Sequence, residues 1–294
     1  MAAMTQPPTR MDTEARLRPR QKPTFDWSDQ PRRRRASRTH GRQHTAKKWV
    51  QPLALTAALA LLVGCYLGPL QQEATTVLAV KKELPIYSVE REDKVISVTF
   101  DASWGGDQTM RILDILDEYN AKCTFFLVGI WVEKYPELVQ EIHRRGHEIG
   151  NHSATHVYMT KVSEDKMRQE LREMSDMTEK LIGIRPTLFR PPYGDYNNKV
   201  VQVSRAEGYE VVQWSVDSLD WKNKGVSDLI SRATKNVQQG DIILFHNDSK
   251  YILDALPTIL KTYQEQGFSM IPAGEILLQG NTTIDVQGKQ HPAD

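Results

Sequence analysis

The sequence predicts an α/β fold in which about seven parallel strands alternate with helices and form a distorted barrel. An N-terminal transmembrane helix and a disordered basic tail are expected ahead of this barrel. Three observations support the prediction. Short β-branched and aromatic runs alternate with amphipathic segments between residues 95 and 271. Polar residues follow the ends of five of those runs. Near the N-terminus, a long stretch without charged residues follows a strongly basic segment.

The first 48 residues carry the positive charge of the chain. They hold 13 Lys or Arg and 4 Asp or Glu, a net charge of +9, whereas the remaining residues carry a net charge of −8. Pro, Gln and Arg are frequent and apolar residues show no regular spacing, so residues 1–48 predict a disordered basic tail in the cytoplasm. The four arginines at 32–35 would suit nucleic acid. A topology signal with affinity for anionic lipid explains them more simply, so no nucleic-acid partner is expected.

Residues 49–70 contain no Asp, Glu, Lys or Arg and are rich in Leu and Ala. About 20 apolar residues span a bilayer, and the basic flank stays in the cytoplasm. The segment therefore predicts a single-pass signal anchor in the cell membrane, with the C-terminal domain extracytoplasmic. Cleavage as a signal peptide and lipidation at Cys65 are alternatives, although the 48-residue segment before this stretch is long for both.

The rest of the chain divides into three parts by composition. Residues 71–90 predict a short stem, residues 91–278 the α/β domain, and residues 279–294 a polar C-terminal tail. Cys123 is the one cysteine of the exported part. The domain therefore has no internal disulfide, and a domain of roughly 200 residues buries enough core to fold without one.

The elements follow from the change in apolar period along the domain. Strands are expected at residues 95–100, 123–128, 147–150, 187–189, 209–216, 241–245 and 268–271. Helices are expected at residues 109–119, 136–145, 163–181, 197–207, 227–237 and 253–265. Ser163 is a candidate N-cap for the third helix, and Gly146, Gly208 and Gly267 follow helix ends. No GxGxxG or GxxxxGK[ST] motif follows the first strand, which excludes the usual nucleotide-binding folds.

Polar residues at the strand ends decide between a barrel and an open sheet. Asp101, His152, Arg190, Asp217 and His246 each come just after, or at the end of, a predicted strand. A barrel gathers the carboxyl ends of its strands at one mouth, whereas an open sheet would spread these residues apart. The sequence therefore predicts a barrel with all five at its mouth.

His152 and His156 form the sharpest local signal. Two histidines four residues apart on a helical turn point the same way and can share a metal ion. A hydrolytic zinc site uses imidazole ligands and leaves a position open for water. An HExxH reading of His147, Glu148 and His152 fails because the spacing is one residue too long and Gly150 interrupts the helix. A structural pair of histidines is the competing interpretation.

Two further clusters carry groups suited to acid–base chemistry. Asp101 ends the first strand before a Gly-rich turn, where it could be a general base, a metal ligand or a helix cap. Arg190 and Tyr193 flank two prolines. The arginine can pair with a carboxylate, and the Tyr193 amide is the first free donor after the prolines and can stabilise an oxyanion.

The last two clusters add acids, indoles and a histidine. Asp217 and Asp220 lie between Trp214 and Trp221, a combination that suits a sugar face as well as an ordinary core. His246 ends a strand and is a candidate general acid, with a capped loop histidine as the alternative.

Taken together and in this order, the five clusters resemble the polysaccharide deacetylases, the NodB-homology group also called carbohydrate esterase family 4. The likeness covers roughly residues 90–275, and five ordered motifs are more specific than any one of them. The Phe-Asp-x-Ser-Trp-Gly form of the first motif, at residues 100–105, resembles the sporulation-associated branch of the family. A membrane anchor near the N-terminus is also similar to that branch.

The resemblance implies a distorted (β/α)7-type barrel of the NodB-homology kind. It implies a hydrolase that removes N-acetyl groups from a glycan, either peptidoglycan or a chitin-like polymer, and releases acetate and an amine. It also implies that His152 and His156 bind a divalent metal ion, Zn²⁺ or Co²⁺. Cell-wall maturation during sporulation is the setting that the resemblance suggests.

The remaining roles come from the same resemblance. Asp101 would be the base that accepts a proton from the attacking water, and Arg190, held by Asp217, would orient it. The Tyr193 amide would help to stabilise the oxyanion, and His246 would protonate the leaving amine. The resemblance also implies that Leu244 and Trp221 line the pocket for the acetyl methyl group. Trp104 is a further candidate for substrate binding, as an indole that suits a sugar face.

Ala102 departs from the family pattern, which usually has two consecutive Asp residues, the base and then a metal ligand. The alanine removes one hard oxygen ligand and one negative charge, so weak metal binding is expected. This motivates a second hypothesis, a glycan-binding module on the same barrel with Trp104, Trp131, Trp214 and Trp221 as sugar platforms. A third hypothesis is an interaction protein whose basic tail binds cytoplasmic partners.

Overall fold

The computed structural model describes residues 82–293, which belong to one structural unit, Leu78–Asp294. The predicted tail, signal anchor and most of the stem lie outside the described residues, so those expectations remain predictions. Among residues 82–293, no helix is long and apolar enough to cross a membrane.

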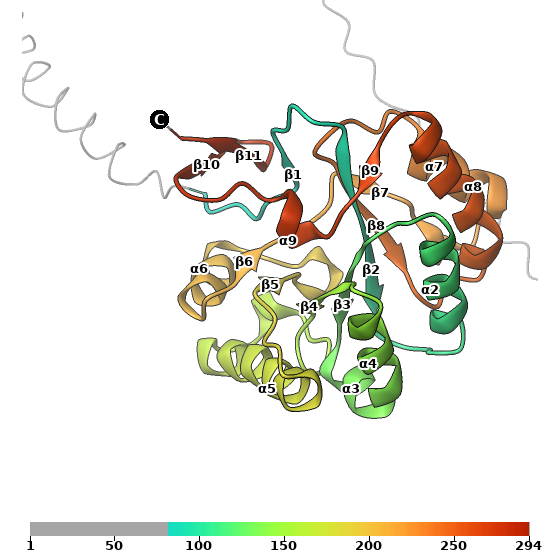
Figure 1. The fold of residues 1–294 in the computed structure, drawn as a ribbon. Coiled ribbons are helices and arrows are strands. Elements are labelled where there is room, and N and C mark those ends of the chain that lie inside the picture. The colour runs from blue at the N-terminus through green and yellow to red at the C-terminus, as the bar shows by residue number, and fades with distance from the viewer. Residues whose placement is uncertain (1–81, 294) are drawn as a thin grey trace, which may run out of the picture. The chain divides into compact units, whose positions relative to one another are not determined.

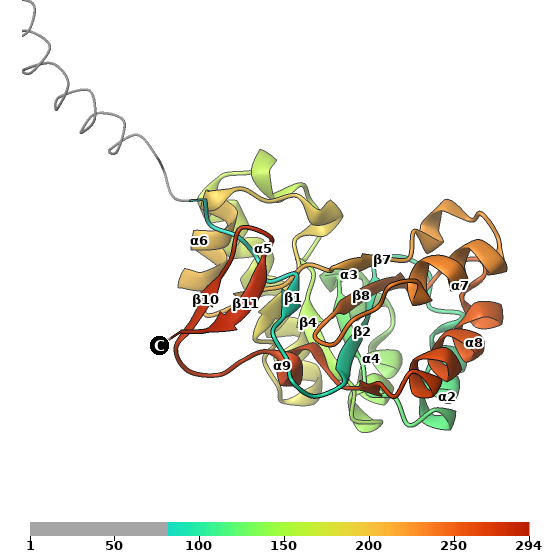
Figure 2. The ribbon, with the colours of Figure 1, turned by 90° about the horizontal axis from the view of Figure 1, so that it is seen from above.

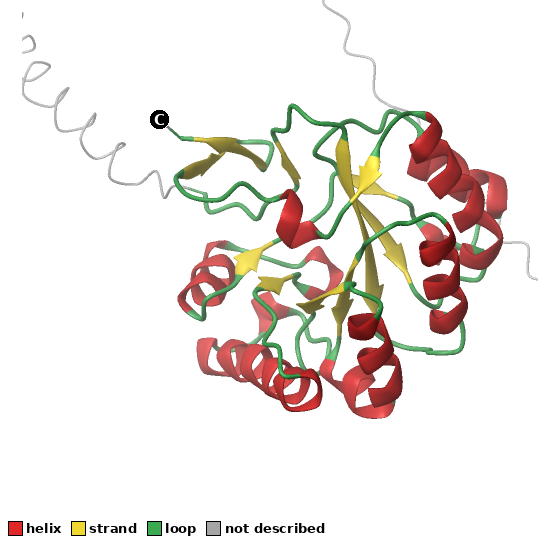
Figure 3. Cartoon of the chain, viewed as in Figure 1, coloured by secondary structure: helices red, strands yellow, loops and turns green. Residues whose placement is uncertain are grey.

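Strands and helices alternate along the described chain (Figures 1 and 3). The strands are β1 (Ser88–Val89), β2 (Val95–Ala102), β3 (Thr124–Leu127), β4 (Glu148–Asn151), β5 (Leu188–Phe189), β6 (Glu210–Val211), β7 (Val216–Asp217), β8 (Ile242–His246), β9 (Ser269–Met270), β10 (Thr282–Ile284) and β11 (Lys289–Pro292). The helices are α2 (Thr109–Glu118), α3 (Gly129–Lys134), α4 (Pro136–Arg144), α5 (Glu164–Ile182), α6 (Asn198–Ala206), α7 (Val226–Thr234), α8 (Ile252–Glu265) and α9 (Ala273–Ile276).

The main sheet is parallel throughout, with the order β6-β5-β4-β3-β2-β8-β7, and β9 pairs with the start of β2. The α/β architecture is therefore as predicted. The sheet curls, but β6 and β7 stand at its two ends, so the barrel stays open between them. The helices surround the curled sheet on its outside (Figure 1). The fold is thus a half-barrel rather than a closed one.

The predicted strand 209–216 is two strands, and this correction explains the opening. Val212 donates to the carbonyl of Phe189 in β5 at 2.9 Å, whereas Ser215 donates to the carbonyl of Ile242 in β8 at 3.0 Å. Between them, Gln213 donates to Ile86 at 2.7 Å, outside the main sheet. The segment therefore crosses from one end of the sheet to the other. Its aromatic and β-branched residues indicated a strand but did not reveal that the hydrogen-bonding partner changes midway.

Alternation along β2 sets the direction of the site. Val98, Phe100 and Ala102 are buried in an apolar cluster that includes residues of α2, α4 and α8. The Phe100 ring lies 5.0 Å from that of Phe125 on the neighbouring strand. Successive side chains of a strand point to opposite faces, so Asp101 lies on the other face, inside the curl of the sheet.

The C-terminal residues form a second sheet that the sequence did not predict. Residues 279–294 were expected to be a polar tail, but β11 pairs with β1 in parallel and with β10 in antiparallel orientation. Figure 2 shows this small sheet beside the main one. His291 lies between two carboxylates, 2.7 Å from Glu90 and 3.1 Å from Asp285. These polar contacts replace the apolar pattern by which a strand is usually recognised.

Ser163 caps α5, as predicted, because its hydroxyl accepts a hydrogen bond from the amide of Lys166 at 3.3 Å. We expect Ser163→Ala to lower the free energy of unfolding by about 1 kcal/mol, since one helix-terminal amide loses its partner. Ser163→Gly should lower the free energy of unfolding by only about 0.3 kcal/mol, because glycine leaves the amide open to water. Urea denaturation of both variants checks this, and equal losses would contradict a capping role.

Candidate active site

A cavity of about 580 Å³ opens where β2, β4 and β8 end. Its lining includes every residue that the sequence singled out for the site except Arg190. These are Asp101, Trp104, His152, His156, Tyr193, Asp217, Trp221, Leu244 and His246. The structure therefore brings together residues that are up to 145 positions apart in the sequence. The chemical roles assigned to them remain predictions.

Arg190 lies behind the cavity, fully buried, and holds Asp101. One guanidinium nitrogen donates to Asp101 Oδ1 at 2.7 Å and to the Thr99 hydroxyl at 2.9 Å, and another donates to the Gln213 carbonyl at 3.0 Å. The guanidinium lies 4.0 Å from the centre of the Phe126 ring. Burial by itself would raise the pKa of Asp101, but the Arg190 cation and the neighbouring histidines keep that pKa below its usual range. Asp101 is therefore a carboxylate at neutral pH.

The predicted pairing of Arg190 with Asp217 is not found, and this is a correction. Asp217 accepts instead from the amide of Leu219 at 2.9 Å, close to its own position in the chain. Asp217 sits at the end of β7, which pairs with β8 at one end of the sheet. The carboxylate that Arg190 binds is Asp101 itself, so the orientation of Asp101 needs no third residue.

Asp220 is the functional residue that the sequence reasoning missed. It is buried, and its Oδ1 accepts from His246 Nδ1 at 2.7 Å while its Oδ2 accepts from the His246 amide at 2.7 Å. The sequence contained a signal, since two acids follow the same strand, but spacing alone did not show which one faces His246. Burial lowers the pKa of His246, and the bond to Asp220 together with nearby negative charge raises it above its usual value overall.

His152 and His156 meet, although not on a helix as predicted. They lie on the loop after β4, where His156 has a positive φ of 58°, and their ring centres are 5.0 Å apart. His152 Nδ1 donates to the Arg190 carbonyl at 2.7 Å, which leaves Nε2 facing Asp101 Oδ2 at 3.5 Å. Burial lowers the pKa of both histidines, that of His156 to about 4, so both rings are neutral at pH 7.

These two rings fit the chemistry of a metal-ligand pair. Imidazole must be neutral to bind a metal ion, and His156 Nδ1 is buried with no hydrogen-bond partner. The bond from His152 to a backbone carbonyl is the kind of contact that fixes a ligating histidine. Within residues 82–293, however, no three His, Cys, Asp or Glu side chains are grouped closely enough to hold an ion. The chain offers two imidazoles with Asp101 beside them.

Ala102 gives the reason that a further ligand is missing. Its side chain is 1% exposed and belongs to the apolar cluster beneath the helices, and it does not line the cavity. Its carbonyl accepts from the Val128 amide at 3.1 Å. The residue after Asp101 is therefore part of the core here, and it adds nothing to the polar site.

Aromatic side chains surround the mouth of the cavity. Trp104, Tyr193 and Trp221 are each more than half exposed, and Leu244 lies buried at the floor. The ring of Tyr193 stacks on that of Tyr158 with centres 4.1 Å apart. Such exposed rings suit the apolar faces of sugars.

Two of the four tryptophans proposed as sugar platforms are not exposed at the mouth of the cavity. Trp131 is buried in the core, and its indole N–H donates to the Gly105 carbonyl at 3.0 Å, so it cannot face a ligand. Trp214 lines the cavity but also packs 5.6 Å from the Arg190 guanidinium. The exposed indoles are thus Trp104 and Trp221.

Comparison with known proteins gives a consistent result. A family model described as polysaccharide deacetylase matches residues 88–212. A peptidoglycan-N-acetylglucosamine deacetylase from Bacillus cereus is 36% identical over 196 residues, which are 65% of this chain and 92% of that protein. The solved structure of the Bc1960 peptidoglycan N-acetylglucosamine deacetylase is 30% identical with a TM-score of 0.64 and covers 66% of this chain and 93% of that one.

A second similar structure differs in its description. BA3943 from Bacillus anthracis, described as a CE4 family pseudoenzyme, is 30% identical with a TM-score of 0.64 and covers 70% of this chain and 69% of that one. A mutant of BA3943 with restored enzymatic activity is 31% identical with the same TM-score and covers 70% of this chain and 72% of that one. The fold around the cavity is therefore shared by proteins described as active and as inactive.

Proposed function

The chain belongs to the polysaccharide deacetylase family, and from this premise we propose that it hydrolyses N-acetyl groups of peptidoglycan outside the cell membrane. The observation that carries the proposal is the meeting of Asp101, the two neutral histidines and the His246–Asp220 pair in one cavity. Relatives named as peptidoglycan deacetylases support the choice of polymer.

The residues divide the reaction between a base and an acid. Asp101, kept ionised by Arg190, accepts a proton from the water that attacks the amide carbonyl carbon. His246, whose pKa the bond to Asp220 helps to raise, gives a proton to the nitrogen as the carbon–nitrogen bond breaks. The products are acetate and a free amine. A divalent metal ion held by His152 and His156, Zn²⁺ or Co²⁺, would supply Lewis acidity at the carbonyl oxygen.

The cavity wall supports an N-acetylated glycan as the substrate. Leu244, which is buried, and Trp221, which is more than half exposed, both line the cavity and offer apolar surface to a small group such as the acetyl methyl. Trp104 and Tyr193 stand exposed at the mouth, where a sugar ring can stack. The Tyr193 amide is proposed as a donor to the oxyanion.

The test uses the purified full-length chain. It is stripped of metal with a chelator, reloaded with Zn²⁺ or Co²⁺, and incubated with peptidoglycan and with N-acetylglucosamine oligosaccharides. We expect acetate release from the reloaded protein, and none from the stripped protein or from Asp101→Asn and His152→Ala variants. A reloaded protein that holds metal but releases no acetate from either glycan would refute the proposed substrate.

A catalytically weak or inactive glycan-binding protein is the second candidate. Ala102 favours it, since the site offers two imidazoles where a catalytic zinc usually has three protein ligands. Affinity for peptidoglycan that His246→Ala leaves unchanged, with no acetate released by the wild type, would establish this alternative. A catalyst would instead lose turnover in that variant.

We also propose that residues 49–70 anchor the domain on the outer side of the cell membrane, where its glycan substrate lies. The basic excess before this segment supports that orientation. Protease added to intact cells without their wall should digest the domain, and protection from digestion would contradict the orientation. A sporulation setting, suggested by the first motif, predicts altered acetylation of spore peptidoglycan in a deletion strain.

A further inference from the structure

The loop that carries the two histidines has an unfavourable backbone. Ser153 and His156 have φ values of 66° and 58°, a region that residues other than glycine rarely adopt. Such conformations persist only where the surroundings determine them. Something other than the intrinsic preference of the loop must therefore hold His156 beside His152.

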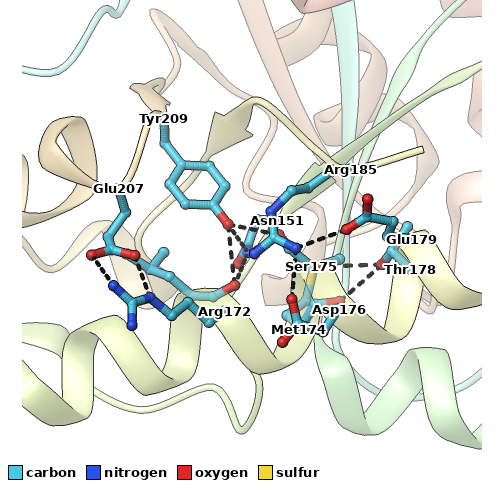
Figure 4. Close-up of polar contacts among 11 residues, drawn as sticks. Asn151, Arg172, Met174, Ser175, Asp176, Thr178, Glu179, Arg185, Glu207 and Tyr209 are labelled. Carbon is cyan, nitrogen blue, oxygen red and sulfur yellow. Dashed lines mark hydrogen bonds and ion pairs between the residues drawn. The ribbon is translucent and has the colours of Figure 1, made fainter. Parts of the chain in front are cut away.

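Two elements hold the first half of this loop. Asn151 accepts from the Ser153 amide at 2.8 Å and donates to the Leu171 carbonyl of α5. It also donates to the Ser175 hydroxyl of the same helix (Figure 4). The Gly129 amide, at the start of α3, donates to the Ser153 carbonyl at 3.0 Å. The Ile130 amide, also in α3, donates to the Ala154 carbonyl at 3.0 Å. These bonds hold the backbone as far as Ala154 and leave Thr155, which directly precedes His156, to another anchor.

Glu170 of α5 is that anchor. Its Oε2 accepts from the Thr155 amide at 2.7 Å and its Oε1 accepts from the Thr155 hydroxyl at 2.8 Å. The side chain is completely buried, and Lys166, one turn earlier on α5, lies 2.9 Å away. A buried carboxylate is costly unless its partners satisfy it, and here both oxygens are used on the single residue that precedes His156.

We propose that Glu170 is a positioning residue that holds His156 in its strained conformation and so keeps the two imidazoles together as metal ligands. The proposal rests on the proposed metal-dependent function. The amide of His156 itself bonds to the Ser153 hydroxyl at 3.0 Å, so the peptide between Thr155 and His156 is held on both sides. Without Glu170, Thr155 loses both partners and the loop can relax towards negative φ.

The test compares three variants on one helix. Glu170→Ala removes both bonds, Glu170→Gln keeps an oxygen for the Thr155 amide, and Glu173→Ala removes a surface glutamate that accepts from Gln169. Co²⁺ affinity and the Co²⁺ absorption spectrum are measured on the full-length chain. We expect about 10-fold weaker binding and an altered spectrum for Glu170→Ala. Near wild-type values are expected for the other two.

A metal-free measurement separates this inference from the proposed function. Contacts between the His156 and Tyr193 rings, whose centres are 4.4 Å apart, give nuclear Overhauser effects in protein with labelled histidine rings. They should disappear in Glu170→Ala and persist in Glu170→Gln. Their persistence in Glu170→Ala would overturn the inference, whereas absence of Co²⁺ binding by the wild type would count against the proposed function alone.

Thr155→Val covers the case in which Glu170→Ala does not fold. It removes only the hydroxyl bond to Glu170 and leaves the carboxylate in place. Several-fold weaker Co²⁺ binding and weakened ring contacts support the inference, and wild-type values for both refute it.

Discussion

Arg190→Ala is expected to lower the free energy of unfolding by about 3–5 kcal/mol, the usual cost of removing one partner from a buried ion pair. The Asp101 carboxylate would remain at 6% side-chain exposure without its cation, and the Thr99 hydroxyl and the Gln213 carbonyl would each lose a donor. The variant would also leave a void against Phe126. Urea denaturation with a single probe of tertiary structure measures the loss.

Arg172→Ala is the matched control for this prediction. Arg172 also pairs with a carboxylate, that of Glu207, but its side chain is 59% exposed at the surface of α5 (Figure 4). Exposed ion pairs contribute about 1 kcal/mol or less because water screens them. If both variants lost the same stability, the Asp101–Arg190 pair would have to be far better hydrated than its burial indicates.

Asp220→Asn is expected to reduce kcat by about 100-fold or more and to move the alkaline limb of the pH–rate profile to lower pH. His246 acts in its protonated form, and its raised pKa keeps that form present at higher pH. Asparagine removes the charge and the carboxylate acceptor, so the lowering effect of burial dominates and His246 loses its proton earlier. Acetate release measured across pH checks both effects.

The comparison that decides this prediction is Asp217→Asn. From the sequence, Asp217 was expected to hold Arg190. In the structure Asp217 accepts from the Leu219 amide, and Asp220 is the carboxylate that binds His246. We expect Asp217→Asn to leave the alkaline limb where it is in the wild type. A larger shift in Asp217→Asn than in Asp220→Asn would contradict the assignment of Asp220 as the partner of His246.

The His246–Asp220 pair also makes the free energy of unfolding depend on pH. A histidine whose pKa is raised by folding stabilises the folded state fully below its unfolded pKa of about 6.5. That stabilisation disappears as pH rises through the folded value. His246 thus adds stability on the acid side of its titration, and Asp220→Asn removes this contribution.

Much of the architecture could be predicted from local patterns. The strand around Phe100 and the helix capped by Ser163 each have a signal within a few residues, namely β-branched alternation and a hydroxyl before an amphipathic run. The gathering of Asp101, His152 and His246 followed from one general property of parallel sheets, the common direction of their carboxyl ends. No long-range information was needed for either step.

The parts that were missed depend on partners far away in the chain. Residues 209–216 were predicted to be one strand because aromatic and β-branched residues occur in both halves. In the structure, however, β6 and β7 lie at opposite ends of the sheet. Asp217 and Asp220 are alike in type and differ only in which one faces His246. The loop that carries His152 and His156 was expected to be helical. Its backbone is instead held in a non-helical conformation by hydrogen bonds to Asn151, at the end of β4, and to Glu170 of α5.

The position of β2 in the sheet has a consequence for the order in which the domain can be assembled. β2 is made first among the strands of the main sheet, and β3 covers one of its edges soon afterwards, but the other edge pairs with β8, residues 242–246. During synthesis that edge has no partner until most of the domain has emerged, and open strand edges associate with other chains. A chain that stops before residue 242 would therefore leave this edge of β2 unpaired and prone to aggregation, and it would not form a smaller folded domain.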